Sequence, residues 1–402
     1  MNPSSSVARE LDQQFVAWLS LGQLITWGSV FYTFALLMEP VERELGLTRA
    51  QSSLAFSMSL LAEGALGYWV GRWIDRGHER VVMTSGSLLV AACLLLHSMV
   101  DSAAGFYMVW IGLGVGTAFT SYSPAFAVVT RRFPDHFRRA IITLTFLGGL
   151  ASTVFIPLSA WLIESLGWRH ALWVLAGMHL LICAPLHAVQ LRGARVHTGP
   201  RPAPSVVSSS ATRLMRSPPF LLVGLFVVLM MGVTTALPPH MVSLLRGQGM
   251  AESWVIAIPA TIGLMQVLGR LVLYFFEHHF DIHLANRIIP MMFPISMVLL
   301  LTSANHPWVA LIFVLLFGMS NGMVTIVKGT AIAQYVNREH VATLNGALGF
   351  PVAVARSLAP LLLGLMWTAQ AGYTYGLWLL LGLSLLAVAA LMLAQRKALP
   401  VG

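Results

Sequence analysis

The feature that most constrains this chain is a series of long apolar runs, separated by short polar connections, from near residue 15 to near residue 395. A helix crosses the apolar core of a bilayer with roughly 20 consecutive apolar residues, and it satisfies its backbone hydrogen bonds within the segment. We therefore predict an all-α polytopic membrane protein with about twelve transmembrane helices. The spans are expected at residues 15–38, 51–71, 80–99, 104–130, 140–163, 168–190, 218–245, 253–276, 284–303, 307–335, 342–368 and 372–395.

Composition and charge distribution agree with a lipid environment. Of the 402 residues, 57% are hydrophobic and 10% are charged, whereas soluble domains carry about a quarter charged residues. The net charge of +9 would by itself suggest nucleic-acid binding. With the N-terminus inside, however, the outer connections carry only Arg43, Arg49, Arg169 and Arg246, and the cytoplasmic side carries about seventeen Lys and Arg. This positive-inside pattern explains the basic charge, and we expect no nucleic-acid partner.

The N-terminal stretch MNPSSSVARELDQQ is polar. It lacks the basic-then-apolar layout of a cleaved signal peptide. We expect the first apolar run to act as a signal anchor, with the N- and C-termini in the cytoplasm and the chain in the inner (cytoplasmic) membrane.

A long polar connection at residues 191–217 divides the chain into two similar halves. It is rich in Pro, Ser, Gly and Arg, which is typical of a flexible linker. We predict one six-helix bundle at 1–190, a cytoplasmic linker at 191–217 and a second bundle at 218–402. The halves echo each other, since LGYWVGRW in the second span resembles MQVLGRLV in the eighth. Internal symmetry of this kind is typical of transporters built from repeats.

The connection between the second and third spans, GRWIDRGHER, is unusually charged. Its Gly71, Asp75, Arg76 and Arg80 resemble the G-x-x-x-D-R-x-G-x-R signature of the major facilitator superfamily, except that glycine stands one place early, at Gly77. Two further runs, MEPVERELGLTRAQSSLAFSMSLL and ESLGWRHALWVLAG, look like the monocarboxylate and oxalate/formate porter branch of that superfamily.

The resemblance implies two pseudo-symmetric six-helix bundles that rock about a central cavity in a chain that works as a monomer. It also implies a gate at the signature. Gly71 would let helices approach closely, and Asp75 would accept hydrogen bonds at a helix N-terminus of the other bundle, where the helix dipole favours a carboxylate. Arg270 matches Arg72 in the repeat and is expected to be the gate residue of the second half. The alternative is a connection that only sets topology.

Two departures from the superfamily weaken the interpretation as a proton-coupled drug antiporter. The fourth span has no arginine before Arg131, at its cytoplasmic end. The fifth span has Ile156 before Pro157, where drug antiporters usually have a Gly-Pro motif.

Glu63 is the carboxylate that lies most clearly within a span. An ionisable group at the bilayer centre costs at least about 2.5–3.5 kcal/mol, so it usually faces a cavity or a partner. Glu63 is therefore a candidate proton-coupling residue. The alternative is a structural glutamate bonded to neighbouring backbone or hydroxyl groups.

Two cations, Lys328 and Arg356, lie within the tenth and eleventh spans. Arginine favours bidentate contact with carboxylates and oxyanions. Asn321, Thr325 and Lys328 share one helical face, and the resemblance implies that the tenth span lines the cavity. These four residues are candidate substrate ligands. In the alternative, Arg356 forms a fixed ion pair and Lys328 reaches the lipid headgroups.

Gln23, Trp27 and Tyr122, in the first and fourth spans, are further candidate substrate ligands, although membrane aromatics more often pack or anchor. The stretch EHHFDIH at 277–283 has metal-binding side chains but is more consistent with a polar turn. Cys93 and Cys183 stand alone in apolar runs, and we expect no metal, cofactor or disulfide framework.

The sequence contains no phosphate-binding G-x-x-x-x-G-K-[ST] motif and no nucleophile motif. We therefore do not expect an enzyme. We predict a secondary active transporter of a small solute, most consistent with an organic or inorganic anion, coupled to protons or to exchange. The alternative is an efflux pump for a drug or for a metalloid such as arsenite. A membrane sensor is a third, weaker alternative.

Overall fold

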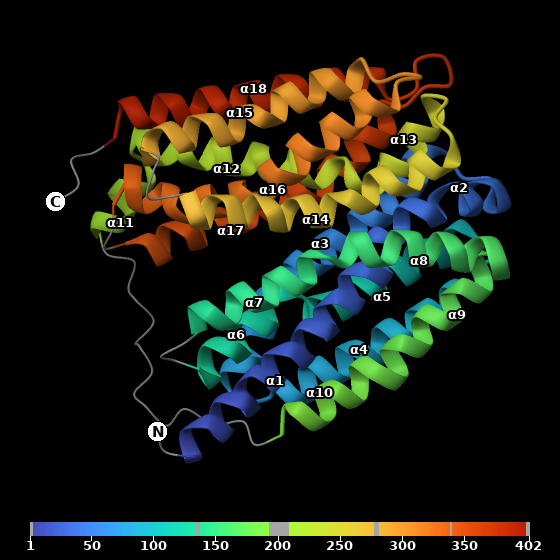
Figure 1. Cartoon of the computed structure of the whole chain (residues 1–402), viewed down its shortest axis with the longest axis horizontal. Helices are drawn as coiled ribbons and strands as arrows, with labels where there is room; N and C mark the ends of the chain where they lie inside the picture. Colours follow the sequence, from blue (N-terminus) through green and yellow to red (C-terminus); the bar gives the residue numbers. More distant parts are fainter. Residues whose placement is uncertain (1–2, 134–136, 193–208, 277–280, 338–339, 399–402) are drawn as a thin grey trace. The chain divides into compact units, whose positions relative to one another are not determined.

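The computed structural model describes residues 3–133, 137–192, 209–276, 281–337 and 340–398. The chain separates into two compact units, Met1–Gly199 and Pro200–Gly402. Within each unit the helices run roughly side by side along a common direction (Figure 1). The described residues form helices throughout, apart from connections and one isolated bridge between Thr368 and Gly372. The all-α prediction is confirmed.

The first unit carries the helical segments up to the expected linker. They are α1 (Pro3–Thr26), η1 (Trp27–Tyr32), α2 (Phe34–Leu45), α3 (Arg49–Asp75), α4 (Glu79–His97), α5 (Ala103–Thr120), α6 (Tyr122–Arg132), α7 (Phe137–Gly149), α8 (Ala151–Leu166), α9 (Trp168–Met178), η2 (His179–Cys183) and α10 (Ala184–Gln190).

The second unit begins with a short helix inside the expected linker, α11 (Ser209–Met215). This part of the linker is therefore helical, and residues 193–208 lie outside the described residues. The following segments are α12 (Pro218–Ala236), η3 (Pro238–His240), α13 (Met241–Gly247), α14 (Glu252–Phe276), α15 (Ile282–Leu301), α16 (Pro307–Tyr335), α17 (Val341–Leu365) and α18 (Thr374–Arg396).

Within the described residues, eleven helical stretches are long and apolar enough to cross a membrane. Ten of them follow single expected spans closely. The first, Gln13–Leu45, extends beyond the expected 15–38 because η1 joins α1 to α2. The remaining expected span corresponds to α3, whose 27 residues are enough to cross a bilayer at 1.5 Å per residue. Charged and polar side chains lower its mean hydropathy, so α3 is not among the eleven.

Several spans are interrupted, which the apolar pattern did not predict. The first and sixth spans contain π-helical turns, η1 and η2. The fourth span breaks at Ser121, which has an extended backbone, and the seventh contains the 3₁₀ turn η3 at Pro238–His240. π-Helical turns occur frequently at functional sites. The interruptions therefore direct attention to the first, sixth and seventh spans.

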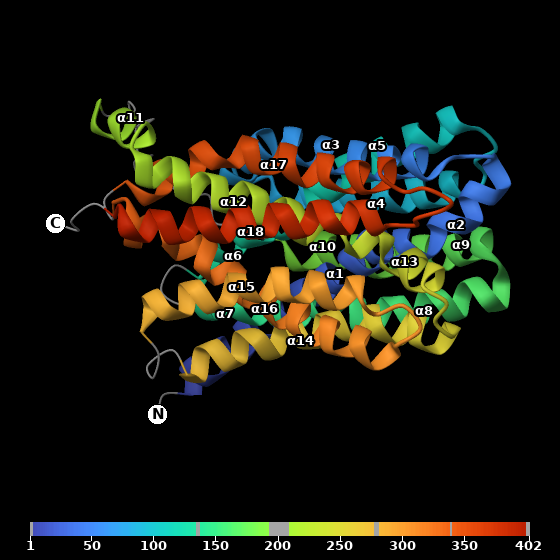
Figure 2. The ribbon, with the colours of Figure 1, turned by 90° about the horizontal axis from the view of Figure 1, so that it is seen from above.

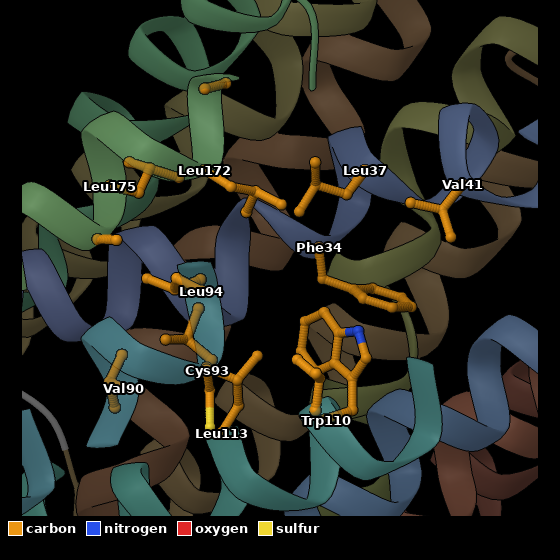
Figure 3. Close-up of a cluster of buried hydrophobic side chains, with 14 of the residues drawn as sticks. Phe34, Leu37, Val41, Val90, Cys93, Leu94, Trp110, Leu113, Leu172 and Leu175 are labelled. Atoms are coloured by element: carbon orange, nitrogen blue, oxygen red, sulfur yellow. The ribbon is translucent and has the colours of Figure 1, made fainter. Parts of the chain in front are cut away.

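The core of the first unit packs aromatic rings among aliphatic side chains, and Figure 3 shows Phe34 and Trp110 within this cluster. The ring of Phe34 stacks on Phe56 with centroids 4.5 Å apart, and it meets the edge of Trp110 at 4.9 Å. Cys93 and Leu94 of α4 and Leu172 of α9 complete this cluster. It joins α2, α3, α4, α5 and α9 into one packed body.

Glycines bring the second and fourth spans of each unit into close contact. A Cβ at Gly114 of α5 would collide with the backbone of Ser59 in α3, and one at Gly322 of α16 would collide with the backbone of Gln266 in α14. In Figure 2, α14 and α16 lie side by side, as their contacts require. Glycines therefore allow a close helix approach in both units, although Gly112 and Gly116 of α5 face α4 whereas Gly318 and Gly322 of α16 face α14.

We expect Gly322→Ala to destabilise the protein, because the new methyl group would displace the backbone of α14. Overpacking of this kind costs about 1–3 kcal/mol. Gly329→Ala in the same helix is the control, since a Cβ there meets nothing within 4 Å, and alanine raises helix stability by up to about 1 kcal/mol. Thermal unfolding in detergent should separate the two variants; equal melting temperatures would contradict the close approach.

Candidate functional site

In the first unit, the charged signature is organised around a residue that was not singled out from the sequence. Glu79 is buried, and Arg131 at the end of α6 pairs with it at 3.1 Å. The same guanidinium donates a hydrogen bond to the carbonyl of Ile74. Glu79 and Arg131 therefore tie the turn between α3 and α4 to the end of the fourth span.

The signature residues themselves face outward. Asp75, Arg76 and Arg80 are exposed, and a Cβ at Gly71 would meet nothing within 4 Å. The packing role expected for Gly71 stays a prediction. In the second unit Arg270 is half-buried at the end of α14 and has interaction partners of its own. A gating role for these residues stays a prediction.

We expect Glu79→Gln to lower the melting temperature, because Arg131 would lose its charged partner while remaining mostly buried. The side chains of Arg131 and Glu79 are 18% and 8% exposed. Hydrogen bonds to charged groups are worth about 1.5–3 kcal/mol. Glu164→Gln, at an exposed position near the end of α8, is the matched control, and unchanged unfolding of Glu79→Gln would show that the pair contributes nothing.

Glu63 opens onto a pocket between the first, second and fourth spans of the first unit. Thr26, Trp27, Ser59, Thr117 and Ser121 supply its polar lining, and Val30, Phe31, Phe56 and Leu60 supply its apolar lining. The free volume is about 20 Å³, which is enough for about one water molecule. The structure thus places Glu63 and Trp27 in one small, mostly apolar pocket.

Several polar atoms around this pocket have no hydrogen-bond partner within the described part of the chain. They are Thr26 Oγ1, Trp27 Nε1 and the neighbouring Gln23 Oε1. The other end of the Gln23 amide, Nε2, donates to the carbonyl of Thr120 at 2.6 Å. Buried polar groups usually find a partner, so unpartnered ones beside a pocket mark a place where a ligand or a proton carrier can bind.

Tyr122 lies next to this pocket. Its ring packs on Trp27, with centroids 5.3 Å apart, and stacks on Phe126. The Tyr122 hydroxyl lies against Gly148, where a Cβ would collide with it and would lie 3.3 Å from Gln23. The structure therefore brings Gln23, Trp27 and Tyr122 together near Glu63.

In the second unit, Lys328 reaches from α16 to α12. Its Nζ lies 3.8 Å from the sulfur of Met231. A Cβ at the adjacent Gly232 would lie 3.7 Å from the carbonyl of Ala355, the residue before Arg356, so Lys328 and the turn that carries Arg356 both lie against the same part of α12. The side chains of Lys328 and Arg356 are half-buried. A thioether is a weak acceptor, so Met231 offers the ammonium little compensation for leaving water.

The remaining members of the predicted face differ in their surroundings. Thr325 is exposed, and its hydroxyl donates to the Gly322 carbonyl of its own helix at 2.7 Å. Asn321 is half-buried. Of this face, Lys328 contacts α12 through Met231.

Acidic side chains are distributed so that they do not neutralise these two cations. The second unit has Glu252, Glu277, Asp281 and Glu339 as its acids between residues 218 and 402, all outside the tenth and eleventh spans. The four cations of the expected outer connections, in contrast, each pair with an acid: Arg43 with Glu39, Arg49 with Glu42, Arg169 with Glu44 and Arg246 with Glu252. Lys328 and Arg356 form a cationic pair within their unit.

Four buried histidines of the described residues, His97, His179, His187 and His240, also escaped the sequence analysis. In the first unit, His179 of η2 bonds Ser29 at 2.7 Å, and His187 of α10 bonds Ser87 at 2.9 Å. In the second unit, His240 of η3 is buried and bonds two other segments. A histidine within an apolar run was the available signal. Residues 277–280, in the metal-binding stretch considered above, lie outside the described residues.

Comparison with known proteins places this arrangement among membrane transporters. The model of the Major Facilitator Superfamily matches residues 19–327. An MFS-type efflux pump of Mycolicibacterium smegmatis is 29% identical over 268 residues, which cover 64% of this chain and 61% of that protein. The match thus spans about three fifths of that relative's length. Lys328 and Arg356 lie beyond the residues that the family model matches.

Two shorter matches concern the branch suggested by the sequence. Monocarboxylate transporter 13 of Rattus norvegicus is 36% identical over 115 residues, covering 27% of this chain and 26% of that protein. An oxalate:formate antiporter of Oxalobacter formigenes is 29% identical over 131 residues, covering 32% of this chain and 31% of that protein. The predicted resemblance to the superfamily and to this branch is confirmed.

The solved structure of the nucleoside transporter NupG superposes with a TM-score of 0.76 at 15% identity, covering 96% of this chain and 99% of that one. At this identity the likeness concerns the fold. The prediction of a transporter-like helical fold is therefore confirmed by structure as well as by sequence.

Proposed function

Because the chain belongs to the Major Facilitator Superfamily, we propose that it is a secondary active transporter that carries a small organic or inorganic anion across the cytoplasmic membrane by alternating access. The observation that carries this proposal is the cationic pair Lys328 and Arg356. Two like charges inside spans are costly, and the spans that hold them contain no carboxylate. A bound anion would supply the missing negative charge.

The chemistry of the pair favours a carboxylate or another oxyanion. A guanidinium presents two parallel N–H groups that match a carboxylate, and an ammonium adds a third, more adaptable donor. The names of two partial relatives, a monocarboxylate transporter and an oxalate:formate antiporter, agree with this class. We therefore propose small carboxylates as the substrate class, with Asn321 and Thr325 as secondary ligands.

Glu63 is our candidate for the coupling residue. It shares its pocket with the unpartnered Thr26 hydroxyl and Trp27 indole, and it lies in the other unit of the chain from the cationic pair. Trp27, Gln23 and Tyr122 would line the part of the first unit that faces the substrate. Proton binding and anion binding would then be carried out by different units.

Flux measurements on purified protein in lipid vesicles test this proposal. Radiolabelled oxalate and lactate would be offered in two conditions: exchange against internal anion, and uptake driven by an inward proton gradient. We expect saturable uptake of at least one of the two. Failure of both in vesicles that contain folded protein would refute the anion proposal.

An efflux function for a drug or metalloid is the second candidate, since an efflux pump of Mycolicibacterium smegmatis matches the largest part of the chain among the relatives described above. Expression in a drug- and arsenite-sensitive bacterial strain distinguishes the two. Resistance to several unrelated compounds, without carboxylate exchange in vesicles, would favour efflux.

A further inference from the structure

His240 occupies the break in the seventh span and contacts two other parts of the second unit. Its side chain is fully buried. One ring nitrogen, Nε2, lies 2.9 Å from the carbonyl oxygen of Pro360 in α17, and the other, Nδ1, lies 3.1 Å from the hydroxyl of Tyr373. That hydroxyl also lies 3.4 Å from Ser243 of α13. One imidazole therefore joins η3, α13, α17 and the residue before α18.

The surrounding chain explains why a polar side chain is needed there. Pro238 and Pro239 lack backbone N–H groups, so the α-helical hydrogen-bond ladder cannot continue through η3. The seventh span is therefore held across its break by side chains. Since a carbonyl can only accept, Nε2 of His240 carries the proton toward Pro360.

The same contact bears on Arg356. This residue lies in α17 between Pro351 and Pro360, both inside the helix. Pro360 has no N–H to offer the carbonyl of Arg356, four residues earlier, so α17 is weakened one turn from the guanidinium. Kinks in helices arise at such positions. His240 holds α17 at Pro360, where the hydrogen bond to the Arg356 carbonyl is missing. It thereby sets the direction of the helical turn that carries Arg356.

Space beside α17 gives it room to move. A cavity of about 230 Å³ lies between α12, α17 and α18, and its lining includes Gly232, Ala355 and Ala359. It is open to the outside, since the lining residues Leu358 and Leu362 are exposed. On this side α17 is not packed against another helix, so it depends more on hydrogen bonds such as those of His240.

The seventh span also touches the other cation. Met231 lies near the end of α12 and contacts Lys328. A Cβ at the adjacent Gly232 would lie 3.7 Å from the carbonyl of Ala355, the residue before Arg356. The segment from Met231 to His240 therefore lies against both helices that carry the cationic pair.

We propose that His240 is a positioning residue for anion binding: through Pro360 and Tyr373 it fixes α17 so that Arg356 stays beside Lys328. The expected loss of anion affinity rests on the proposed anion function, whereas the positioning of α17 by His240 does not. Loss of the histidine contacts lets α17 turn at Pro360 toward the cavity. Arg356 then moves away from Lys328, and anion affinity falls.

Full-length protein in lipid vesicles provides the test, with radiolabelled oxalate as the probe. His240→Phe keeps a ring of similar size and removes both hydrogen bonds. We expect the KM for oxalate to rise about tenfold, the loss of roughly one hydrogen bond to a charged group, while the maximal rate per folded protein stays within about twofold. His240→Gln, whose amide can donate to the Pro360 carbonyl, should restore most of the affinity.

Two further variants keep the test decisive. Tyr373→Phe removes a single hydroxyl and should raise KM less than His240→Phe; in the His240→Phe background it should add nothing, because contacting residues are not additive. His306→Gln, at an exposed position before α16, is the control. If His240→Phe fails to fold, the KM of Tyr373→Phe for oxalate decides the question. A KM equal to that of the unmodified protein overturns the proposal.

Hydrogen–deuterium exchange of the same proteins separates this proposal from the anion function. We expect faster exchange of segments 238–247 and 357–373 in His240→Phe, with α14 unchanged. Exchange identical to the unmodified protein overturns the positioning role. Faster exchange with an unchanged KM overturns the link to Arg356. If the unmodified protein carries neither oxalate nor lactate, the anion function fails, and the exchange data still decide whether His240 holds α17.

Discussion

Vesicles that contain Lys328→Gln or Arg356→Gln are expected to lose carboxylate uptake and exchange. Each substitution removes one of the two cations that lie within the tenth and eleventh spans while keeping a polar side chain. A hydrogen bond to a charged group is worth about 1.5–3 kcal/mol, and each 1.4 kcal/mol is about tenfold in affinity. We therefore expect affinity to fall about 10- to 100-fold for either variant.

The controls for this prediction are two cations at the exposed end of a helix. Arg396→Gln and Lys397→Gln remove exposed charges at the end of α18, and they should leave uptake unchanged. Both spans should insert at least as well without the intramembrane charge, because charge opposes insertion. Normal oxalate and lactate flux by Lys328→Gln and Arg356→Gln would remove the basis for an anionic substrate.

Glu63→Gln is expected to separate exchange from proton-driven accumulation. Glutamine keeps the shape of a protonated glutamate but cannot release a proton, so the pocket beside Trp27 would stay neutral. Exchange of internal for external anion requires no net proton movement and should persist. Uptake driven by an inward proton gradient should fall to the level seen without a gradient.

This second prediction is checked by measuring both fluxes in the same preparation of vesicles, with internal pH followed by a trapped dye. Glu164→Gln, near the exposed end of α8, is the matched carboxylate control and should behave as the unmodified protein. Proton-driven accumulation that survives in Glu63→Gln would assign coupling to another group. Loss of exchange together with accumulation, in folded protein, would instead assign Glu63 to substrate binding or to structure.

Much of the architecture followed from the chain's one-dimensional pattern. Apolar runs of about 20 residues can only be long helices in a bilayer, because no water is present there to satisfy free backbone groups. The resemblance of LGYWVGRW to MQVLGRLV predicted related halves, and each half has glycines where α5 or α16 approaches a neighbouring helix. These features depend on residues that are close together in the sequence, so the sequence alone reveals them.

The site was predicted less completely. Intramembrane charge singled out Glu63, Lys328 and Arg356, because charge within an apolar run is conspicuous. Glu79 was overlooked because it lies in a charged turn, where its burial depends on Arg131, 52 residues away. His240 was overlooked because its two partners lie 120 and 133 residues further along the chain.

The sequence by itself determined that this chain crosses a membrane as two related sets of helices and that a few charges are retained within them. Hydrophobicity and helix geometry act over one or two turns, so they leave a mark on neighbouring residues. Only the tertiary structure decided which spans are broken, which polar atoms share the pocket of Glu63, and which side chain of α12 Lys328 contacts. Those outcomes depend on contacts between distant segments, and the free energy of such contacts is not a property of either segment alone.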